Sequence, residues 1–591
     1  MKKNILICLL YRMDSKIQMM PTGATYVSAS LKRESYNVHN FVWDTSKDSN
    51  KITNIMNQFN IDVVMCGGTV YDSSVINQIF TTAKEAVPNV LTISGGPLMC
   101  YSPEEAMELM PQCDIGVIGE AEITACNLME SIEANKPLDT VNNIVYKNSS
   151  NELKFTEQCD NKPDLATIPM PDIESFFGDW LMNSNCYSVS AGRGCSSLCT
   201  FCTKMSHYRE RPLEKLFEEL DYYVPKYKLK KIWFVNEYFN TEESYLDAFC
   251  EKMKSYGVSI FYLTRISPNL TVDVLKKLKN AGVDDIQFGL ESADDTVLRS
   301  MRKGVTSKLM LDVLKNVKAA RINVSGSFVF GDPAETKETL NNTLDFIKAN
   351  RDLFYGIGFN MLLLWPGSYL YKKAVSDGIL DPIQHIKNGC PPINISQLTD
   401  DEYVHYRDYG FANFFSTVFN TDFNIKDVTV QGTTLTLKCS ICNKQHICEI
   451  KPKEMQPFPY KFFCSCGEQL SVDYISHLFN KAKASEIVKN YNTAFYGIGA
   501  LFQKIYSTCN FGESNLYFLN SSVENLSTQS DLKIHPPKAI KDFGIEKVIV
   551  TISGSFDADA IISDLREKYP QTEFMMWYEV GEVMTSGASD R

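Results

Sequence analysis

Three cysteines stand within eight residues, in the stretch "AGRGCSSLCTFC" at 191–202. Cys195, Cys199 and Cys202 are separated by three and then by two residues. Thiolates at such short spacing are ligands for soft metals, which means iron–sulfur clusters or zinc. A structural zinc site takes four protein ligands, whereas a cubane held by three cysteines keeps one iron open for another ligand. The spacing therefore predicts a reactive 4Fe-4S cluster.

A second group of cysteines lies in a β-hairpin pattern near residue 450. Its two pairs are Cys439, Cys442, Cys464 and Cys466. Four thiolates at this spacing predict a structural zinc ribbon. The second pair is Cys-x-Cys and not the commoner Cys-x2-Cys, so Cys448 or His446 could replace one ligand. An auxiliary iron–sulfur cluster is the alternative, and zinc is favoured because tetrahedral ribbons close around it.

The bulk properties bound the class of protein. A chain of 591 residues predicts three to five domains. Hydrophobic residues make up 44% and charged residues 22%, as in globular proteins. The formal net charge of −12 argues against a general nucleic-acid binder, because phosphate contacts need a basic surface. We therefore expect no nucleic-acid partner.

The cysteine usage and the amino terminus indicate a compartment. Eighteen cysteines in so long a chain are too few for a disulfide scaffold, and their clustering indicates metal thiolates under reducing conditions. The first residues, "MKKNILICLLYRMD", lack a signal-peptide cleavage site and are typical of a buried first strand. No apolar run reaches the roughly 18 residues that a membrane span needs. We expect a soluble, cytoplasmic protein without a membrane partner.

Two α/β domains are predicted to carry the first part of the chain. Residues 1–150 alternate strands and helices in the pattern of a doubly wound, Rossmann-like parallel sheet. Glycines follow its strands: Gly67, Gly68, Gly95, Gly96 and Gly119. Such sheets bind ligands at the carboxyl ends of their strands, where glycine lets the backbone approach a ligand. The alternative is that these glycines only turn the chain.

Residues 180–385 repeat a strand-then-helix unit six times, which predicts a partial or full (β/α) barrel. The three-cysteine loop follows the first of these strands directly. Because barrel active sites lie at the carboxyl ends of the strands, the cysteines fall where chemistry is expected.

The remaining chain divides into three predicted segments. Residues 386–430 are expected to be a helical connector, 431–480 the zinc ribbon, and 485–585 a second Rossmann-like α/β module. The module contains a Gly-x-Gly turn in "FYGIGALF", which by itself is weak evidence for a nucleotide. A docking or dimerisation module is the favoured alternative.

The first domain resembles the cobalamin-binding domain that precedes many radical SAM enzymes. The resemblance rests on Pro21-Thr22-Gly23, on "SGGPLMC" and on "IGEAEIT". It implies a corrinoid cradled by four strand-end residues: Thr69, Gly95, Gly96 and Glu120. No Asp-x-His-x-x-Gly motif is present, so bound cobalamin would lack a histidine lower ligand from that motif. A domain that keeps the fold without the cofactor is the alternative.

The barrel resembles the radical SAM superfamily, in which the open iron chelates S-adenosylmethionine and an electron from the cluster cleaves it to a 5′-deoxyadenosyl radical. The resemblance assigns Phe201 to the adenine. It assigns Asn236 and Glu237 to the methionine amino group and Arg265 to the carboxylate. Glu291 and Ser292 stand where the family contacts the ribose or the methionine. The turns "FVFGDPAETKETL" and "LLLWPGSYLY" also match the family's pattern.

Together the resemblances imply a radical SAM enzyme that uses cobalamin to methylate an unactivated carbon of an unknown substrate. Its partners would be a small-molecule or carrier-linked substrate and a reductant such as flavodoxin or ferredoxin. A radical rearrangement or cyclisation enzyme is the first alternative. A non-catalytic cluster or cobalamin sensor is the second, and it is disfavoured because a sensing cluster gains nothing from an open iron.

Overall fold

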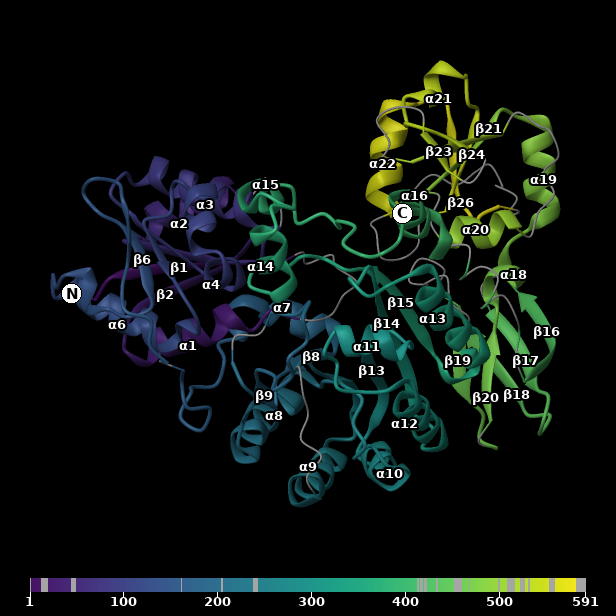
Figure 1. The fold of residues 1–591 in the computed structure, drawn as a ribbon, viewed down its shortest axis with the longest axis horizontal. Coiled ribbons are helices and arrows are strands. Elements are labelled where there is room, and N and C mark those ends of the chain that lie inside the picture. Colours follow the sequence, from purple (N-terminus) through teal and green to yellow (C-terminus); the bar gives the residue numbers. More distant parts are fainter. Residues whose placement is uncertain are drawn as a thin grey trace. The chain divides into compact units, whose positions relative to one another are not determined.

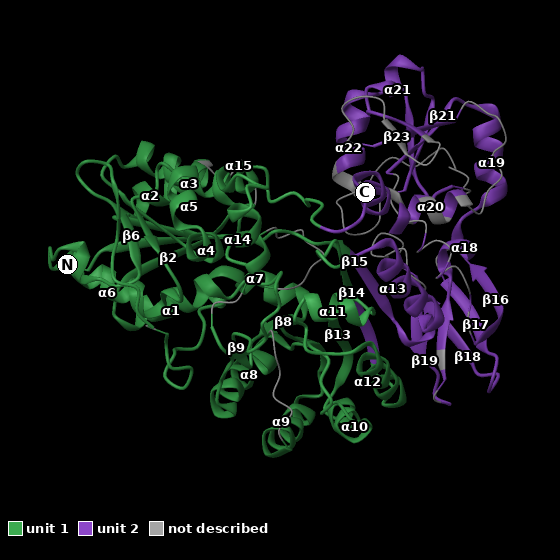
Figure 2. Ribbon diagram, in the orientation of Figure 1, with its two compact units in different colours: residues 1–322, 327–334, 360–395 green, residues 323–326, 335–359, 396–591 purple. Residues whose placement is uncertain are grey.

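In a computed structural model of the protein, the described residues form six sheets (Figure 1). Three are large and mostly parallel, two small ones make up the ribbon, and the last is the two-stranded ladder of β9, Gly192–Arg193, and β10, Arg209–Glu210. The chain divides into two compact units (Figure 2). The first comprises residues 1–322, 327–334 and 360–395, and the second the remainder. The structure describes residues 2–11, 20–43, 49–160, 162–203, 206–236, 243–411, 414, 418, 422, 424–431, 434–450, 460–466, 468–497, 500–507, 516–520, 527–529, 532–551 and 558–580.

The first sheet has the strand order β2-β1-β3-β4-β5-β6-β7. Its strands are β1 Asn4–Leu10, β2 Asn37–Trp43, β3 Val63–Gly67, β4 Leu91–Gly95, β5 Ile115–Val117, β6 Ile144–Lys147 and β7 Leu153–Phe155. The intervening helices are α1 Gly23–Arg33, α2 Ser49–Phe59, α3 Ser73–Ala86, α4 Pro97–Tyr101, α5 Pro103–Leu109 and α6 Ala121–Glu133, with a short η2 at Leu138–Thr140. Strands β1 to β5 pair in parallel, and β6 and β7 add antiparallel edges.

This strand order fixes where a ligand can lie. The chain leaves β1 toward β2 on one side and returns to β3 on the other, so the order 2-1-3-4-5 has its switch point between β1 and β3. Ligands of open α/β sheets bind outside the carboxyl ends of the strands at such a point. The continuous apolar run of β1, buried over Ile5–Leu9, is typical of a strand covered on both faces.

The second sheet has the order β15-β14-β13-β12-β11-β8, so that neighbours along the chain are neighbours in the sheet. Its strands are β8 Cys186–Val189, β11 Lys231–Phe234, β12 Ser259–Thr264, β13 Val283–Glu291, β14 Asn323–Phe330 and β15 Gly356–Met361. The helices are α7 Glu174–Ser184, α8 Leu213–Tyr227, α9 Glu243–Tyr256, α10 Val272–Asn280, α11 Asp295–Ser300, α12 Ser307–Ala319, α13 Lys337–Ala349, η3 Arg351–Leu353, α14 Tyr369–Ser376 and α15 Pro382–Lys387. This is the predicted partial barrel.

Local sequence explains where several barrel helices begin. The hydroxyls of Thr271, Thr306 and Thr336 each accept a hydrogen bond from the backbone N–H three residues later, which caps α10, α12 and α13. Every second residue of β14 is buried, from Val324 to Phe330. Each of the six predicted barrel strands is present, and the predicted α/β fold class is confirmed.

The part of the second unit that follows residue 395 holds the ribbon and the last module. Its elements are α16 Asp400–His405, η4 Tyr406–Gly410, β16 Ile425–Gln431, β17 Thr434–Cys439, β18 Gln445–Glu449, β19 Tyr460–Phe463, β20 Gln469–Val472, α18 Tyr474–Leu478, α19 Lys481–Asn490, β21 Thr493–Tyr496, α20 Ala500–Ser507, β22 Leu516–Leu519, β23 Ser527–Gln529, β24 Leu532–His535, α21 Ala539–Asp542, β25 Lys547–Val550, α22 Ala558–Lys568 and β26 Glu573–Met576. Residues 425–430, expected in the helical connector, are strand because "IKDVTVQ" places β-branched residues in pairing with β17.

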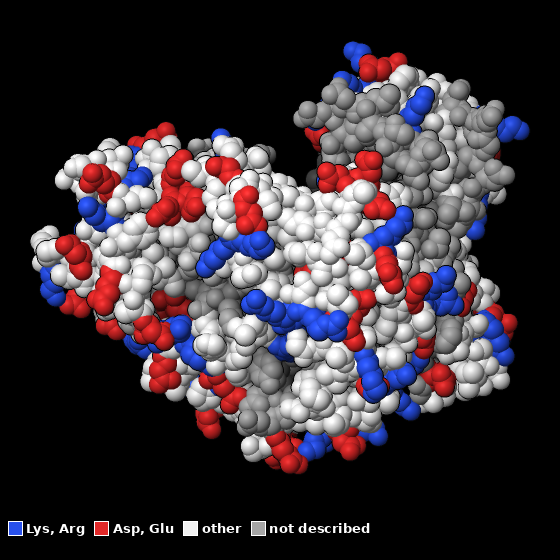
Figure 3. Space-filling view, viewed as in Figure 1, with Lys and Arg blue, Asp and Glu red and all other residues white. Residues whose placement is uncertain are grey.

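Charge and helix length bear on possible partners. Lys and Arg lie among Asp and Glu over the visible face (Figure 3), in keeping with the net charge of −12. The absence of a nucleic-acid partner stays a prediction. In the described part of the chain, no helix combines the length and the apolar character needed to cross a membrane.

Candidate active site

The loop that carries the three cysteines is closed at its base by a two-stranded ladder. Strand β9, Gly192–Arg193, pairs antiparallel with β10, Arg209–Glu210. Within the loop the Cys195 N–H donates to the Ser206 carbonyl at 3.1 Å. Gly194 has a φ of +79°, and a Cβ there would lie 2.6 Å from the Ser206 carbonyl oxygen. Only glycine therefore lets the chain turn from β9 into the first cysteine.

The cysteine loop is tied to the barrel by backbone hydrogen bonds on both sides of Thr200. The Thr200 N–H donates to the Met301 carbonyl, and the Leu370 N–H donates to the Thr200 carbonyl, both at 3.0 Å. Cys195 and Cys199 are half-buried and Cys202 is exposed, and all three are free thiols. Three accessible thiols on one anchored loop fit a cluster with three protein ligands. Phe201, predicted against the adenine, packs on an apolar group that includes Leu364 and Leu370.

A buried ion pair lies beside the cysteines. Glu291 ends β13 with a left-handed φ of 63°, and its Oε1 is 2.7 Å from the Lys303 Nζ, with both side chains 9% exposed. The Arg265 guanidinium donates to the Lys303 carbonyl at 2.6 Å. Burial raises the pKa of the Cys199 thiol, and the charges of Lys303 and Arg265 oppose that rise. Glu291 and Cys195 add to the rise, so the pKa of this thiol stays above its ordinary value.

Lys303 was missed by sequence reasoning. It stands in "MRKG" between α11 and α12, twelve residues after Glu291, where a lysine looks like an ordinary surface residue. Its burial and its pairing with Glu291 depend on the left-handed end of β13.

Three more residues were predicted to bind S-adenosylmethionine, and the structure describes two of them, both buried. Asn236 is buried, and its Oδ1 accepts from the Ala191 N–H at 3.3 Å, which ties the end of β11 to the residue before β9. Ser292 is buried, and its hydroxyl accepts from the Asp294 N–H at 3.1 Å. Glu237 lies outside the described residues. The predicted contacts of these residues with the cofactor stay predictions.

The glycines at the carboxyl edge of the first sheet are not equivalent. Gly96 has a φ of +84°, and a Cβ there would lie 3.0 Å from Gly68 N and 3.1 Å from Gly68 O. A Cβ on Gly95 would meet only the Val117 carbonyl oxygen, at 3.8 Å. Gly96 is therefore required by the fold itself, whereas Gly95 leaves free space at the edge where a corrinoid is expected. Thr69 at this edge donates through its N–H and its hydroxyl to the Asp72 carboxylate, at 2.6 and 2.8 Å.

Glu120 reaches from this edge to the cysteine loop. Arg193 Nη1 lies 2.7 Å from Glu120 Oε2 and 2.7 Å from Glu122 Oε1, and Arg209 also pairs with Glu120. The two carboxylate side chains are 8% and 6% exposed, and the Arg193 guanidinium lies 4.6 Å over the Tyr26 ring. Burial alone would lower the pKa of Arg193, but Glu122, Tyr26 and Glu120 raise it. We call these four groups, Glu120, Glu122, Arg193 and Arg209, the carboxylate–arginine bridge.

Residues 360–395 make a second connection between barrel and first domain within the same unit. The Trp365 ring packs edge-on against the Tyr71 ring, with centroids 5.5 Å apart. A Cβ on Gly367, whose φ is +90°, would lie 2.5 Å from the Tyr101 ring. Helix α15 packs on α5. The turn "LLLWPGSYLY" therefore lies against the loop that follows β3, next to the expected corrinoid edge.

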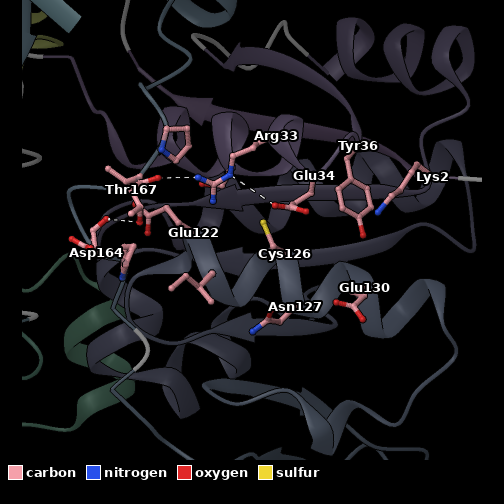
Figure 4. Close-up of a pocket in the computed structure, with 15 residues that line it drawn as sticks. Lys2, Arg33, Glu34, Tyr36, Glu122, Cys126, Asn127, Glu130, Asp164 and Thr167 are labelled. Atoms are coloured by element: carbon pink, nitrogen blue, oxygen red, sulfur yellow. Dashed lines mark hydrogen bonds and ion pairs between the residues drawn. The ribbon is translucent and has the colours of Figure 1, made fainter. Parts of the chain in front are cut away.

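A separate hollow of about 340 Å³ lies between α1, α6 and residues 163–169 (Figure 4). Arg33 crosses it to donate to the Thr167 carbonyl at 2.9 Å. Burial raises the pKa of the Cys126 thiol in its wall to about 11, so the thiol stays protonated at neutral pH. Two of its lining residues contact the base of the cysteine loop: Glu122 pairs with Arg193, and the Pro163 carbonyl accepts a hydrogen bond from Arg209 at 2.8 Å.

Two family models match the chain. The B12 binding domain model matches residues 12–129, and the Radical SAM superfamily model matches residues 189–347. These ranges contain the corrinoid edge and the three cysteines, respectively. The chain therefore carries a B12-binding domain followed by a Radical SAM domain, as the two resemblances in the sequence predicted.

Several known proteins are similar to this chain. An uncharacterized methyltransferase of Pyrococcus horikoshii is 26% identical over 65% of this chain and 87% of its own length. The anaerobic magnesium-protoporphyrin IX monomethyl ester cyclase of Cereibacter sphaeroides is 24% identical over 55% of each chain, so the match spans about half of that relative. The radical S-adenosylmethionine methyltransferase TsrM of Kitasatospora setae, solved with cobalamin and a 4Fe-4S cluster, superposes with a TM-score of 0.53 at 14% identity, over 64% of this chain and 78% of TsrM. At 14% identity, the similarity to TsrM shows a shared fold and no more.

The cluster assignment predicts the effect of removing one thiol. Changing Cys195, Cys199 or Cys202 to Ala should abolish reductive cleavage of S-adenosylmethionine, because a cubane with two protein ligands is labile. Iron content and 5′-deoxyadenosine formation measure the effect. The control is Cys159→Ala, which removes an exposed free thiol elsewhere in the chain. Full radical production by any of the three variants would refute the assignment.

The bridge predicts a stability loss that is larger than that of an exposed ion pair. Arg193→Met removes the arginine that pairs with the buried Glu122 and leaves Glu120 paired with Arg209 alone, and it should destabilise the first unit by about 3–5 kcal/mol. Arg193→Lys keeps the charge but lacks the planar guanidinium that lies over the Tyr26 ring, so it should fall between Met and wild type. The control Lys215→Met removes the exposed pair with Glu218 and should change little. Urea unfolding measures all three, and equal effects of Arg193→Met and Lys215→Met would contradict the prediction.

Proposed function

We propose that this enzyme transfers a methyl group to an unactivated carbon and that it uses cobalamin to do so. The observation that carries the proposal is the carboxylate–arginine bridge. Glu120 follows β5 at the corrinoid edge of the first sheet, and Arg193 stands two residues before Cys195. The bridge holds the edge that would bind a corrinoid against the loop that would bind the cluster. Methyl transfer from a corrinoid to a substrate radical needs both groups to face one reaction chamber.

The residues of the chain have distinct parts in this proposal. When bound, the cluster and S-adenosylmethionine supply a 5′-deoxyadenosyl radical, and cobalamin carries the methyl group. Cys195, Cys199 and Cys202 hold the cluster, and the Glu291–Lys303 pair and Arg265 set the charge beside it. Gly95 leaves space for a flat ring against the backbone of β4. Tyr71 and Trp365 lie against each other at the same edge and connect the loop after β3 to residues 360–395.

The cobalamin in this proposal has no histidine ligand from the first domain. His39 is the only histidine within residues 1–150. It lies near the beginning of β2 and its ring stacks on Phe59, with centroids 4.1 Å apart. The beginning of a parallel strand is at the opposite edge of the sheet from the carboxyl ends. Nitrogen hyperfine splitting from a protein histidine in the Co(II) spectrum would contradict this part of the proposal.

A radical cyclisation or rearrangement is the second candidate function. It is favoured by one comparison, the 24% identity to the magnesium-protoporphyrin IX monomethyl ester cyclase over 55% of this chain. The relative from Pyrococcus horikoshii is named a methyltransferase and is matched over 87% of its length. We therefore rank methyl transfer first. The substrate class follows from neither relative.

Product analysis separates the two candidates. The enzyme is purified anaerobically, reconstituted with cluster and cobalamin, and reduced with S-adenosylmethionine present. Methyl transfer to the corrinoid predicts methylcobalamin and S-adenosylhomocysteine in addition to 5′-deoxyadenosine. Formation of 5′-deoxyadenosine without S-adenosylhomocysteine would overturn the methyltransferase proposal and support the second candidate.

The glycine geometry predicts a variant that reports on cobalamin and not on folding. Gly95→Val should fold, because the new side chain meets only one backbone atom near its Cβ, but it should fill the corrinoid space and abolish cobalamin binding. Cluster content and abortive cleavage of S-adenosylmethionine should persist, because they belong to the barrel. Gly178→Ala, a glycine with open space in α7, is the matched control. Normal cobalamin binding by Gly95→Val would refute the assignment of this edge.

Comparing Gly96→Val with Gly95→Val distinguishes a glycine that the fold requires from a glycine that leaves space for the ligand. The φ of +84° at Gly96 and its approach to Gly68 make valine unfavourable with or without cobalamin. We expect Gly96→Val to lose thermal stability in the absence of the cofactor, whereas Gly95→Val should unfold close to wild type. Equal stability of the two variants without cofactor would contradict the difference between these glycines.

A further inference from the structure

The four cysteines of the ribbon come together from two hairpin turns. Cys439 ends β17 and Cys442 lies in the following turn, while Cys464 and Cys466 lie in the turn between β19 and β20. Their Sγ atoms all lie within 4.8 Å of one another. Each turn is closed by its own backbone bonds, from Asn443 N–H to the Cys439 carbonyl at 3.0 Å and from Cys464 N–H to the Glu468 carbonyl at 2.8 Å.

The distances between the sulfur atoms suit a single ion. Cys439 Sγ is 3.8 Å from Cys466 Sγ, and Cys442 Sγ is 3.4 Å from Cys464 Sγ. Four thiolates around zinc at about 2.3 Å form a tetrahedron with edges of about 3.8 Å. A cubane places each thiolate on a different iron and therefore needs its ligands further apart. The geometry consequently favours one zinc ion over the auxiliary iron–sulfur cluster.

The neighbouring candidates for ligands are not needed. His446 on β18 has its Nε2 3.3 Å from Cys464 Sγ, which is a hydrogen-bond position toward a ligand sulfur. Cys448 lies opposite Leu435 in the β17–β18 ladder and is outside the four-cysteine group. Four thiolates complete a tetrahedral shell, and a complete shell without an open position is typical of structural zinc.

The ribbon is joined to the edge of the barrel sheet through Lys461. This residue lies on β19, three positions before Cys464, and is 6% exposed. Its ammonium donates to the carbonyls of Arg351, at 3.1 Å, and of Phe354. Those carbonyls belong to the turn η3 and its end, just before β15. A buried ammonium needs such partners, so the position of β19 and that of the β15 entry are coupled.

We propose that Cys439, Cys442, Cys464 and Cys466 bind one structural zinc ion, and that this ion braces the entry into β15 through Lys461. Zinc replaces the thiol protons, which leave to solvent, and no electron is transferred. Holding Cys464 fixes the end of β19, and β19 carries the lysine that caps the η3 carbonyls. The site lies in the second unit and is independent of the proposed methyl transfer.

Metal analysis of the full, cluster-reconstituted chain tests the site. Wild type should contain about one zinc per chain in addition to the cluster iron. Cys439→Ser and Cys466→Ser should lose most of the zinc and keep the iron and the visible absorption of the cluster. Cys448→Ala, in the same ribbon, should keep both metals. Wild-type zinc in the two serine variants, or loss of iron in place of zinc, would overturn the proposal.

X-ray absorption spectroscopy at the zinc edge of the wild-type holoenzyme identifies the ligand atoms without any variant. Four sulfur scatterers at about 2.3 Å are expected. A shell containing nitrogen or oxygen would overturn the four-thiolate site. This measurement decides the question even if the serine variants do not fold.

Hydrogen exchange tests the brace. Removal of zinc by the Cys466→Ser change should accelerate exchange of the β15 amides, residues 356–361, by about tenfold or more, because local protection depends on the packing of the strand entry. Lys461→Met should accelerate the same amides while keeping the zinc. Unchanged exchange at β15 in both variants would overturn the brace while leaving the zinc site to the metal analysis.

Discussion

The pairing of two buried carboxylates with Arg193 is the interaction on which the arrangement of the site depends. Glu120 and Glu122 stand at the start of α6, and Arg193 stands in β9, so one side chain connects the first sheet to the cysteine loop. Charges with less than a tenth of their surface exposed are costly unless they are paired. Separating the first domain from the cysteine loop would therefore leave buried carboxylates without their arginine. The position of the cysteine loop is thus fixed relative to the carboxyl edge of the first sheet.

This constraint explains why several glycines surround the site. Gly194 lets the chain pass from the bridge residue Arg193 into Cys195 with a positive φ. Gly96 lets the backbone after β4 approach Gly68, and Gly367 lets the turn after β15 approach Tyr101. Each position brings two backbones or a backbone and a ring closer than any side chain would allow. The free space beside Gly95 is where we propose that the corrinoid binds.

The fold was predictable from the sequence, and three candidate cluster ligands could be named, because strand periodicity and cysteine spacing are local features of the sequence. Strand and helix periodicity gave the six barrel strands, and the three cysteines are neighbours along the chain. The partners of charged residues were not predictable in this way. Glu120 was expected to face a corrinoid and is also paired with two arginines, while Lys303 was overlooked because its burial depends on the end of β13. Which residues face a cofactor is decided by contacts between distant segments, and periodicity carries no such information.

Magnetic coupling between cobalt and cluster tests most directly whether the two domains form one reaction chamber. The cobalamin-loaded enzyme is prepared with Co(II), and its electron paramagnetic resonance spectrum is recorded with the cluster oxidised and with the cluster reduced. We predict that reduction of the cluster broadens or splits the Co(II) signal, and that the effect disappears in Cys199→Ala. A Co(II) spectrum that is identical in both states of the wild-type cluster would contradict the account.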